Sequence, residues 1–324
     1  MPYSHHSHSG EFCNHATGGL EEIIQEAIRQ GMEMLAMTEH MPRNYEADLY
    51  PGESESGWSI PEQATIFDNF YHKARELQSK YQVAEVELLV GMEIDWIRPD
   101  GSRDWIERLL SKYPLDFFVG SVHHVHGIPI DYDQEHYDRA ARRSLEQRAS
   151  EESVFMAEQL LFEDYFDDQY DMLRALKPPV VGHFDLIRLL SKSKDASWEV
   201  HPRVWNKIER NLQYIRSYDG ALELNSAGLR KGMQEPYPKL EICQYFNKLG
   251  GKFVLSDDSH GIAHVGHSYE GVLSHARLAH IEHLTVFLHS QHTDGQDQRF
   301  PNTVTKSVTV NGVAASRFWR GKTV

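Results

Sequence analysis

The stretch VELLVGMEIDW, residues 86–96, indicates the fold class of this 324-residue chain. Its nearly continuous apolar character is typical of a strand that is buried on both faces of a parallel sheet. The next segment, SRDWIERLLSKY (102–113), has the apolar spacing of a helix, and LDFFVGSVHH (115–124) again resembles a buried strand. The order strand, helix, strand predicts an α/β fold with a mainly parallel sheet.

The same alternation of short apolar runs and helical periods extends in both directions along the chain. Further strands are expected within MLAMTEH (34–40), PVVGHFDL (179–186), GALELNSAG (220–228), GKFVLSDDSH (251–260) and LTVFLHS (284–290). Helices are expected within 18–31, 61–80, 201–217, 238–249 and 268–280, and a polar loop at 41–57. Seven or eight such units favour a (β/α) barrel over an open sheet.

No internal repeat or change of composition marks a domain boundary, so residues 1–324 are expected to form a single barrel domain. The pattern from 135 to 176 is helical, charged and longer than a minimal crossover requires, which predicts a helical insertion. Residues 294–324 are polar and weakly patterned, and we expect them to form a C-terminal tail.

The bulk composition excludes several classes of partner. A formal net charge of −15 leaves no basic surface stripe for nucleic acid. No window contains the roughly 18 apolar residues of a membrane span, and the amino terminus does not resemble a signal sequence, so a cytoplasmic protein is expected. The two cysteines, Cys13 and Cys243, fit a reducing compartment. Cys13 lies between two histidines, but we interpret it as a small buried core residue.

The residues with metal-binding or catalytic chemistry fall at the carboxyl ends of the expected strands. In chain order these are His6 and His8, Glu39 and His40, Glu93 and Asp95, His123 and His124, His183, Asn225 and Arg230, and Asp258 and His260. In a barrel these strand ends meet at one mouth, where barrel enzymes build their sites. Each residue alone is explained by ordinary hydrogen bonding, but so many ligand types at one rim indicate a metal centre.

Two carboxylates strengthen this interpretation. Glu93 lies among Val90, Met92 and Ile94, and Asp258 follows the apolar run KFVL, so each needs a partner that offsets its desolvation. The whole set of imidazoles and carboxylates exceeds what one ion accommodates. We therefore expect two or three divalent transition-metal ions, with zinc, iron and manganese all compatible with these ligands.

Motifs of other enzyme classes are missing from the sequence. It contains no GxxxxGK[ST] loop, no GxGxxG after a strand, no GxSxG elbow and no HExxH helix. Nucleotide-binding, serine-hydrolase and zincin chemistry are therefore not indicated.

Six motifs resemble, in order, those of the PHP (polymerase and histidinol phosphatase) phosphoesterases. They are HxH at 6–8, TEH at 38–40, GMEID at 91–95, SVHH at 121–124, GHFDL at 182–186 and SDDSH at 256–260. Within that family, ELNSAGLRK (223–231) followed by YPK is similar to the histidinol-phosphatase branch, particularly its longer fungal-type members. The resemblance implies a distorted seven-stranded, TIM-like barrel with a trinuclear metal site.

The resemblance also implies a ligand set for each ion. The first set is His6, His8, Glu93 and Asp258; the second is Glu93, His123 and His183; the third is His15, His40 and His260. Glu93 would bridge the first two ions. SVHH leaves His124 as an alternative to His123, and SDDSH offers Asp257 beside Asp258, where the DxH spacing to His260 favours Asp258.

Hydrolysis of a phosphate monoester requires positive charge, because the dianion repels an incoming hydroxide. Clustered divalent ions neutralise phosphoryl oxygens and lower the pKa of bound water to about 7. We expect Arg230 to form a fork with two phosphoryl oxygens, assisted by Lys231, with Arg43 and His267 as further phosphate-binding candidates. Asp257 could orient water or protonate the leaving alkoxide.

The function implied by the resemblance is hydrolysis of L-histidinol phosphate to L-histidinol and phosphate in histidine biosynthesis. One alternative keeps the metal chemistry but acts on another small phosphate ester or on a nucleic-acid 3′ end. A second alternative is a metal-binding regulatory protein without turnover. The acidic charge disfavours nucleic acid as a partner, and the sequence does not define an oligomeric state.

Overall fold

The structure is a computed structural model, and it describes residues 2–82, 86–148, 156–290, 295 and 297–319. Within these residues the parallel strands form two sheets. The first sheet has the order β1 (Tyr3–Ser4), β2 (Met34–Met37), β3 (Glu87–Val90). The second has the order β10 (Lys252–Ser256), β9 (Ala221–Asn225), β8 (Val180–Val181), β5 (Val119–Ser121), β4 (Glu93–Asp95). The predicted α/β class with parallel sheets is confirmed.

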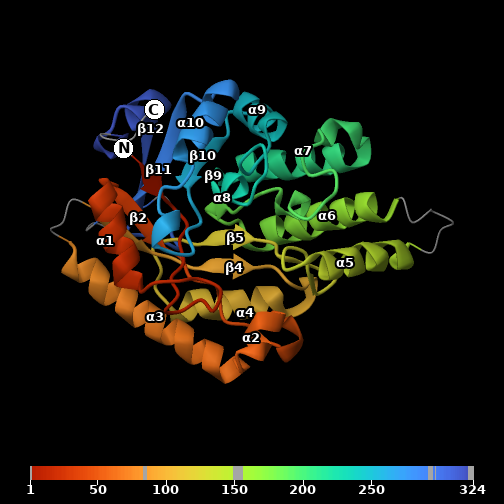
Figure 1. The fold of residues 1–324 in the computed structure, drawn as a ribbon, viewed down its shortest axis with the longest axis horizontal. Helices are drawn as coiled ribbons and strands as arrows, with labels where there is room; N and C mark the ends of the chain where they lie inside the picture. The colour runs from red at the N-terminus through yellow and green to blue at the C-terminus, as the bar shows by residue number, and fades with distance from the viewer. Residues whose placement is uncertain (1, 83–85, 149–155, 291–294, 296, 320–324) are drawn as a thin grey trace.

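Helices lie outside the strands, as Figure 1 shows for β4 and β5 in the middle of the molecule. They are α1 (Leu20–Gln30), α2 (Pro51–Glu55), α3 (Ile60–Lys80), α4 (Pro99–Lys112), α5 (Gln134–Gln147), α6 (Ala157–Leu176), α7 (Pro202–Ser217), α8 (Ala227–Arg230), α9 (Leu240–Lys248), α10 (Tyr269–Leu278) and α11 (Val310–Ala314). The expected helices are thus confirmed, while the predicted loop 41–57 contains the short α2. Between them the apolar strand residues form a continuous buried core.

The first helix shows how local sequence sets an element. Leu20, Ile23 and Ile24 in α1 are buried on one face. Gly31 ends the helix in the left-handed conformation, with a φ of 78° that glycine adopts without steric cost. The helix expected within 18–31 is confirmed.

The segment that defined the fold class is divided between two strands. Gly91 and Met92 separate β3 from β4, so the expectation of one continuous strand over this segment is wrong. The Gly91 N–H donates to the Met37 carbonyl at 2.8 Å, and the Met92 carbonyl accepts from the Val119 N–H at 2.9 Å. A Cβ on Gly91 would lie 2.9 Å from Thr38 Cγ2, so glycine allows the chain to bend here against β2.

The two parallel sheets are not closed into one continuous ladder, so a closed barrel is not confirmed. Single parallel bridges join them, one between Ser7 and Ser259 and one between His40 and Glu93. A backbone hydrogen bond from the His5 N–H to the Leu255 carbonyl, 3.1 Å long, adds to the first contact. These links lie at the carboxyl ends of the strands, where the polar residues collect.

The last part of the chain differs from the expected tail. β11 (His283–His289) pairs antiparallel with β12 (Thr303–Thr309) along the whole of both strands, and α11 follows. β12 has the sequence TVTKSVT and is largely exposed, so backbone pairing rather than an apolar face holds it. That is why the sequence of β12 shows only a weak apolar pattern. No helix in the described part of the chain is long and apolar enough to cross a membrane.

Candidate metal centre

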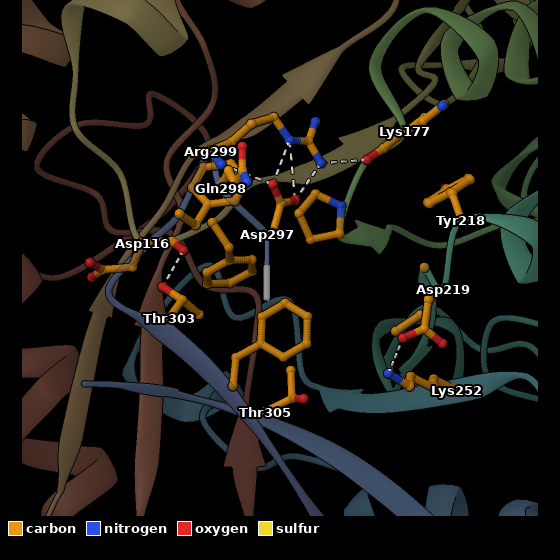
Figure 2. A pocket seen from close by; sticks show the side chains of 16 residues that line it. Asp116, Lys177, Tyr218, Asp219, Lys252, Asp297, Gln298, Arg299, Thr303 and Thr305 are labelled. Atoms are coloured by element: carbon orange, nitrogen blue, oxygen red, sulfur yellow. Dashed lines mark hydrogen bonds and ion pairs between the residues drawn. The ribbon is translucent and has the colours of Figure 1, made fainter. Parts of the chain in front are cut away.

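Two of the large cavities in the described part of the chain lie near opposite ends of the parallel strands. One, of about 420 Å³, lies beside the first residues of β9 and β10, Ala221 and Lys252. Figure 2 shows four of its charged side chains in two ion pairs, Lys252 with Asp219 and Arg299 with Asp297. No cluster of metal-ligand residues found in the described chain lies in it. This cavity is therefore not the metal centre.

The other cavity, of about 690 Å³, lies at the carboxyl ends of the strands. Its wall contains many of the predicted site residues, which are His15, His40, Glu93, His123, His183, Arg230, Lys231, Asp258 and His260. Side chains that are far apart in the sequence share one cavity.

Glu93 lies at the middle of the cluster and is 1% exposed. Its Oε2 lies 2.8 Å from His40 Nδ1, 3.3 Å from His6 Nε2 and 3.4 Å from His8 Nε2. Its Oε1 lies 3.0 Å from His183 Nε2 and 3.3 Å from His123 Nε2. The two oxygens of one carboxylate thus face two separate groups of imidazoles, as a bridging ligand requires.

The ring nitrogens of these imidazoles approach one another in pairs. Nε2 of His6 lies 3.0 Å from Nε2 of His8, Nε2 of His123 lies 3.2 Å from Nε2 of His183, and Nε2 of His15 lies 3.1 Å from Nε2 of His260. Two nitrogens bound to one zinc ion in a tetrahedral site would be about 3.3 Å apart, given Zn–N bonds of about 2.0–2.1 Å. The residues present therefore fit shared cations.

Four groups of three or more ligand residues have their ligand atoms within 4.8 Å of one another. They are His6, His8 and Glu93; Glu93, His123 and His183; His8, Asp258 and His260; and Cys13, His15, His40 and His260. The first three contain only imidazole and carboxylate ligands. The fourth contains all the residues of the predicted third set and, in addition, a cysteine.

The structure distinguishes between the two adjacent aspartates. Asp258 Oδ1 lies 3.5–3.8 Å from ring nitrogens of His6, His8 and His260. The oxygens of Asp257 instead accept hydrogen bonds from Ser4 Oγ, the Ser259 N–H and the Gly266 N–H. Asp257 is fully buried and does not line the cavity. Its predicted role on water or the leaving group is not supported by this geometry.

The two adjacent histidines are also distinguished. His123 Nε2 faces Glu93 and His183, whereas His124 Nδ1 lies 3.0 Å from Asp95 Oδ2. Asp95 Oδ1 also accepts the His123 N–H at 3.1 Å. Asp95 thus fixes both histidines, with His123 directed to the centre and His124 directed away from it.

Two further carboxylates orient the first histidines. The Nδ1 atom of His6 lies 2.8 Å from Glu223 Oε1, and Nδ1 of His8 lies 3.3 Å from Glu39 Oε2. Such partners select the ring tautomer and direct Nε2 toward the cation. Glu223 was not among the predicted site residues. Its position inside the apolar run ALELN is the same signal that singled out Glu93 and could have identified it.

The electrostatics keep the central carboxylates ionised. Burial would raise the pKa of Glu93, but the neighbouring His6 and His123 outweigh it and hold the pKa well below its ordinary value. Burial likewise opposes ionisation of Asp258, and His6, His260 and His8 lower its pKa well below the ordinary value. Anionic carboxylates at neutral pH are what divalent cations require.

The predicted phosphate-binding residues do not all reach the cavity. Arg230 and Lys231 line it, and the two Nη atoms of Arg230 donate to the carbonyls of Asp257 and Asp258 at 2.8 Å each. Arg43 is buried instead, with its Nη1 3.0 Å from Asp95 Oδ2, and it does not line the cavity. Its charge holds Asp95 in place.

His267 also lies off the cavity, and its Nδ1 is 2.7 Å from Ser268 Oγ. His264, for which the sequence pattern indicates no role, lines the wall, and its Nδ1 accepts the His260 N–H at 3.2 Å. The turn after His260 therefore places His264 on the cavity wall, whereas His267, the phosphate-binding candidate from the sequence, does not line it.

His5, which precedes His6 in the sequence, does not face the metal centre. The Nδ1 of His5 donates to the Leu255 carbonyl at 2.9 Å, and its Nε2 accepts the Phe287 N–H at 3.2 Å. Burial lowers the pKa of His5 to about 4, so the ring is neutral and can make both bonds. His5 thus joins β10 and β11, while His6 and His8 turn to the metal centre.

Comparison with known proteins agrees with this site. The model of the PHP domain family matches residues 4–227. A "Probable histidinol-phosphatase" of Schizosaccharomyces pombe is 40% identical over 316 residues, covering 97% of this chain and 96% of that protein. The histidinol-phosphatase of Saccharomyces cerevisiae is 35% identical over 300 residues, covering 83% and 86% of the two chains.

Solved structures share the fold. A structure from Listeria monocytogenes has a TM-score of 0.68 at 24% identity and covers 83% of this chain and 99% of its own. Histidinol phosphate phosphatase from Lactococcus lactis, solved with zinc, L-histidinol and phosphate, has a TM-score of 0.57 at 17% identity and covers 86% and 91% of the two chains. From the family match and the identity to its fungal relatives, the chain belongs to the PHP domain family, in its histidinol-phosphatase branch.

Proposed function

We propose that this protein is a metal-dependent phosphomonoesterase that hydrolyses L-histidinol phosphate to L-histidinol and phosphate, a step of histidine biosynthesis. The observation that carries the proposal is the position of Glu93 between two groups of imidazoles, on the wall of a cavity that also contains Arg230 and Lys231. The substrate follows from the names of the relatives that are 40% and 35% identical.

The residues that would hold the ions fall into three sets. His6, His8, Glu93 and Asp258 would hold one, Glu93, His123 and His183 a second, and His15, His40 and His260 a third. Imidazole and carboxylate ligands suit zinc, iron or manganese. When bound, such ions neutralise phosphoryl oxygens and lower the pKa of a coordinated water.

The protein's own side chains bind and orient the substrate. Arg230 has its two Nη atoms engaged with the carbonyls of the Asp257–Asp258 segment, so its guanidinium is held rigidly at the cavity wall. Hydrogens that these bonds do not use remain for a phosphate, and Lys231 adds a second positive charge beside it. These two residues make one wall attractive to an anion in a chain of net charge −15.

The wall of the cavity also carries carboxylates that belong to none of the ligand sets. Asp131 and Glu55 line it together with Tyr50 and Tyr132. Asp131 Oδ1 accepts the Tyr50 hydroxyl at 3.0 Å. A wall with both cationic and anionic side chains suits a substrate that has a phosphate at one end and an ammonium group at the other.

We further propose that the two parallel sheets form one distorted, seven-stranded, TIM-like barrel within a single domain of residues 1–324, in which β3 and β4 together make one bent strand. The bridges from Ser7 to Ser259 and from His40 to Glu93 support this, because they join the first sheet to the two edge strands of the second. Helices α5 and α6, which extend to one side in Figure 1, would be an insertion at 135–176.

The alternatives are disfavoured by specific features. A nucleic-acid 3′ end would need a basic channel, and the cavity wall offers two cationic side chains beside carboxylates. A regulatory protein without turnover would not be expected to keep a complete set of ligands, and each predicted metal-ligand residue lies in one of the four groups.

The proposal is tested by one panel of substrates. Metal-replete protein is incubated with histidinol phosphate, p-nitrophenyl phosphate and single-stranded DNA, and release of phosphate or nucleotide is followed. We expect kcat/KM for histidinol phosphate to exceed that for p-nitrophenyl phosphate at least about tenfold, because the amine contributes binding. Equal activity on both esters would indicate a general phosphatase, and no activity on any of them would refute an enzymatic role.

A further inference from the structure

The third cluster of ligand residues contains a cysteine. Cys13 is 4% exposed, and its Sγ lies 3.4 Å from both ring nitrogens of His15. The Sγ of Cys13 and a ring nitrogen from each of His15, His40 and His260 all lie within 4.8 Å of one another. Cys13 is the buried member of this group, and His15 is the exposed one. The sequence alone predicts only a small core residue at this position.

The backbone holds Cys13 in this place. The Cys13 N–H donates to the Ser9 carbonyl at 2.9 Å, and the Ala16 N–H donates to the Cys13 carbonyl at 3.2 Å. The Thr17 N–H donates to the His260 carbonyl at 3.0 Å, which ties this turn to the end of the last parallel strand. The relative position of the thiol and the imidazoles is therefore set by the fold and not by a free loop.

The imidazoles of the cluster are arranged as ligands. Nε2 of His15 and Nε2 of His260 face each other at 3.1 Å, a contact that two neutral imidazoles make only if the N–H of one donates a hydrogen bond to the nitrogen of the other. Both ring nitrogens of His40 are shielded from solvent, and in the described chain neither makes a well-directed hydrogen bond. A cation between these rings would give a ring nitrogen of each of the three histidines a partner.

We propose that Cys13, as a thiolate, is the fourth protein ligand of the cation held by His15, His40 and His260. The S–H bond breaks, the proton passes to solvent, and a sulfur–metal bond forms without transfer of electrons. One thiolate and three imidazoles make a complete tetrahedral set of the kind that zinc takes in proteins. This proposal depends on the proposed function in one respect, which is that this cluster of residues binds a metal ion.

The thiolate makes this site different from the other two. The remaining groups offer only imidazole nitrogens and carboxylate oxygens, which accept iron and manganese as readily as zinc. A soft sulfur ligand favours zinc over manganese. We therefore expect the third site to retain zinc in protein that is loaded with manganese at the other two sites.

Cobalt substitution gives a readout that does not depend on activity. Protein loaded with Co²⁺ should show a sulfur-to-cobalt charge-transfer band in the near ultraviolet. Cys13→Ser should abolish this band, with the bound cobalt falling by no more than one ion per chain. Cys243→Ser is the matched control, because Cys243 is equally buried but lies by the Pro238 carbonyl and His275. A band that survives in Cys13→Ser would overturn the proposal.

A second measurement needs no change at Cys13 itself. In the Cys243→Ser protein, Cys13 is the one remaining thiol. It should be protected from a thiol-directed disulfide reagent while zinc is bound and should react after chelation. Equal reaction rates in both states would also overturn the proposal. A protein that shows the cobalt band but leaves histidinol phosphate intact would refute the proposed function alone, and hydrolysis without the band would refute the thiolate alone.

Discussion

At the scale of single residues, Glu93 joins the two halves of the metal centre. Its Oε2 faces His6, His8 and His40, and its Oε1 faces His123 and His183. No other carboxylate in the described chain reaches both groups at these distances. Loss of this side chain would leave two clusters of imidazoles without the anion that holds their ions together.

Glu93→Ala is therefore expected to lower kcat/KM for histidinol phosphate by more than about 100-fold, the upper range for loss of a residue that merely supports a ligand. Bound metal, measured by elemental analysis, should fall by at least one ion per chain. Glu270→Gln, an exposed carboxylate in the first turn of α10, is the control and should retain both. Unchanged metal content in Glu93→Ala would exclude a bridging role.

Most residues of the site could be predicted from the sequence, because a charged side chain at the end of a buried strand has few explanations. The choice between neighbours came from the family resemblance, which favours His123 and Asp258, and not from the strand pattern. Whether His123 or His124 faces the centre depends on Asp95, and whether Asp257 or Asp258 does so depends on Ser4 and Gly266. Asp95 and Ser4 come from distant parts of the chain, so the contacts that fix each choice could not be read from the local sequence.

At the scale of elements, strand and helix positions followed from local periodicity, and the errors arose where pairing is not local. The run 86–96 reads as one strand, but it bends at Gly91 to contact β2 on one side and β5 on the other. β12 has no apolar period because its exposed residues are held by backbone bonds to β11. In both cases the pairing with a partner strand, and not the apolar pattern of the segment itself, decides where the strand forms.

Close packing of strands predicts the effect of a small change beside β8. A Cβ on Gly182 would lie 2.5 Å from Ser121 Oγ and 2.8 Å from Val119 Cγ1, both on β5. Gly182→Ala should therefore separate β5 from β8 and lower the free energy of unfolding by about 1–3 kcal/mol, as overpacking does. Urea unfolding measures this. Since His183 is the next residue, metal occupancy of its site should fall as well.

Gly52→Ala is the matched control for this prediction. Its new Cβ would meet only Asn14 Nδ2, at an ordinary 3.6 Å, within the helix α2. We expect its stability to match that of the parent protein within about 0.5 kcal/mol. If Gly182→Ala were as stable as Gly52→Ala, the close approach of β5 and β8 would not be a constraint on the fold.

At the scale of the whole molecule, the metal centre concentrates charge in the interior of an acidic protein. Without ions, buried carboxylates and imidazoles stabilise each other. Burial would lower the pKa of His8, but Glu39 and Glu93 outweigh it and raise the pKa to about 9. Burial also opposes protonation of His6 and His123, and nearby carboxylates raise both pKa values well above the ordinary value. The metal-free protein therefore holds protons on these rings at neutral pH.

These bound protons stabilise the metal-free protein but oppose the binding of metal ions. A raised histidine pKa stabilises the metal-free fold at pH values below about 6.5, the unfolded pKa, and for His8 that contribution is lost as the pH rises through about 9. Metal ions require neutral imidazoles, so their binding must displace these protons. The apparent metal affinity should keep rising between pH 6.5 and 9, where that of a site built from unperturbed histidines would level off.

Titration calorimetry at pH 7 tests this directly. Zinc is added to metal-free protein in two buffers that differ in ionisation enthalpy, and the difference in heat gives the number of protons released. We expect at least one proton per chain, because His6, His8 and His123 all start protonated. Identical heats in the two buffers would mean that the rings are neutral before metal binds. The central carboxylates would then lack the positive partners that keep them ionised in the metal-free fold.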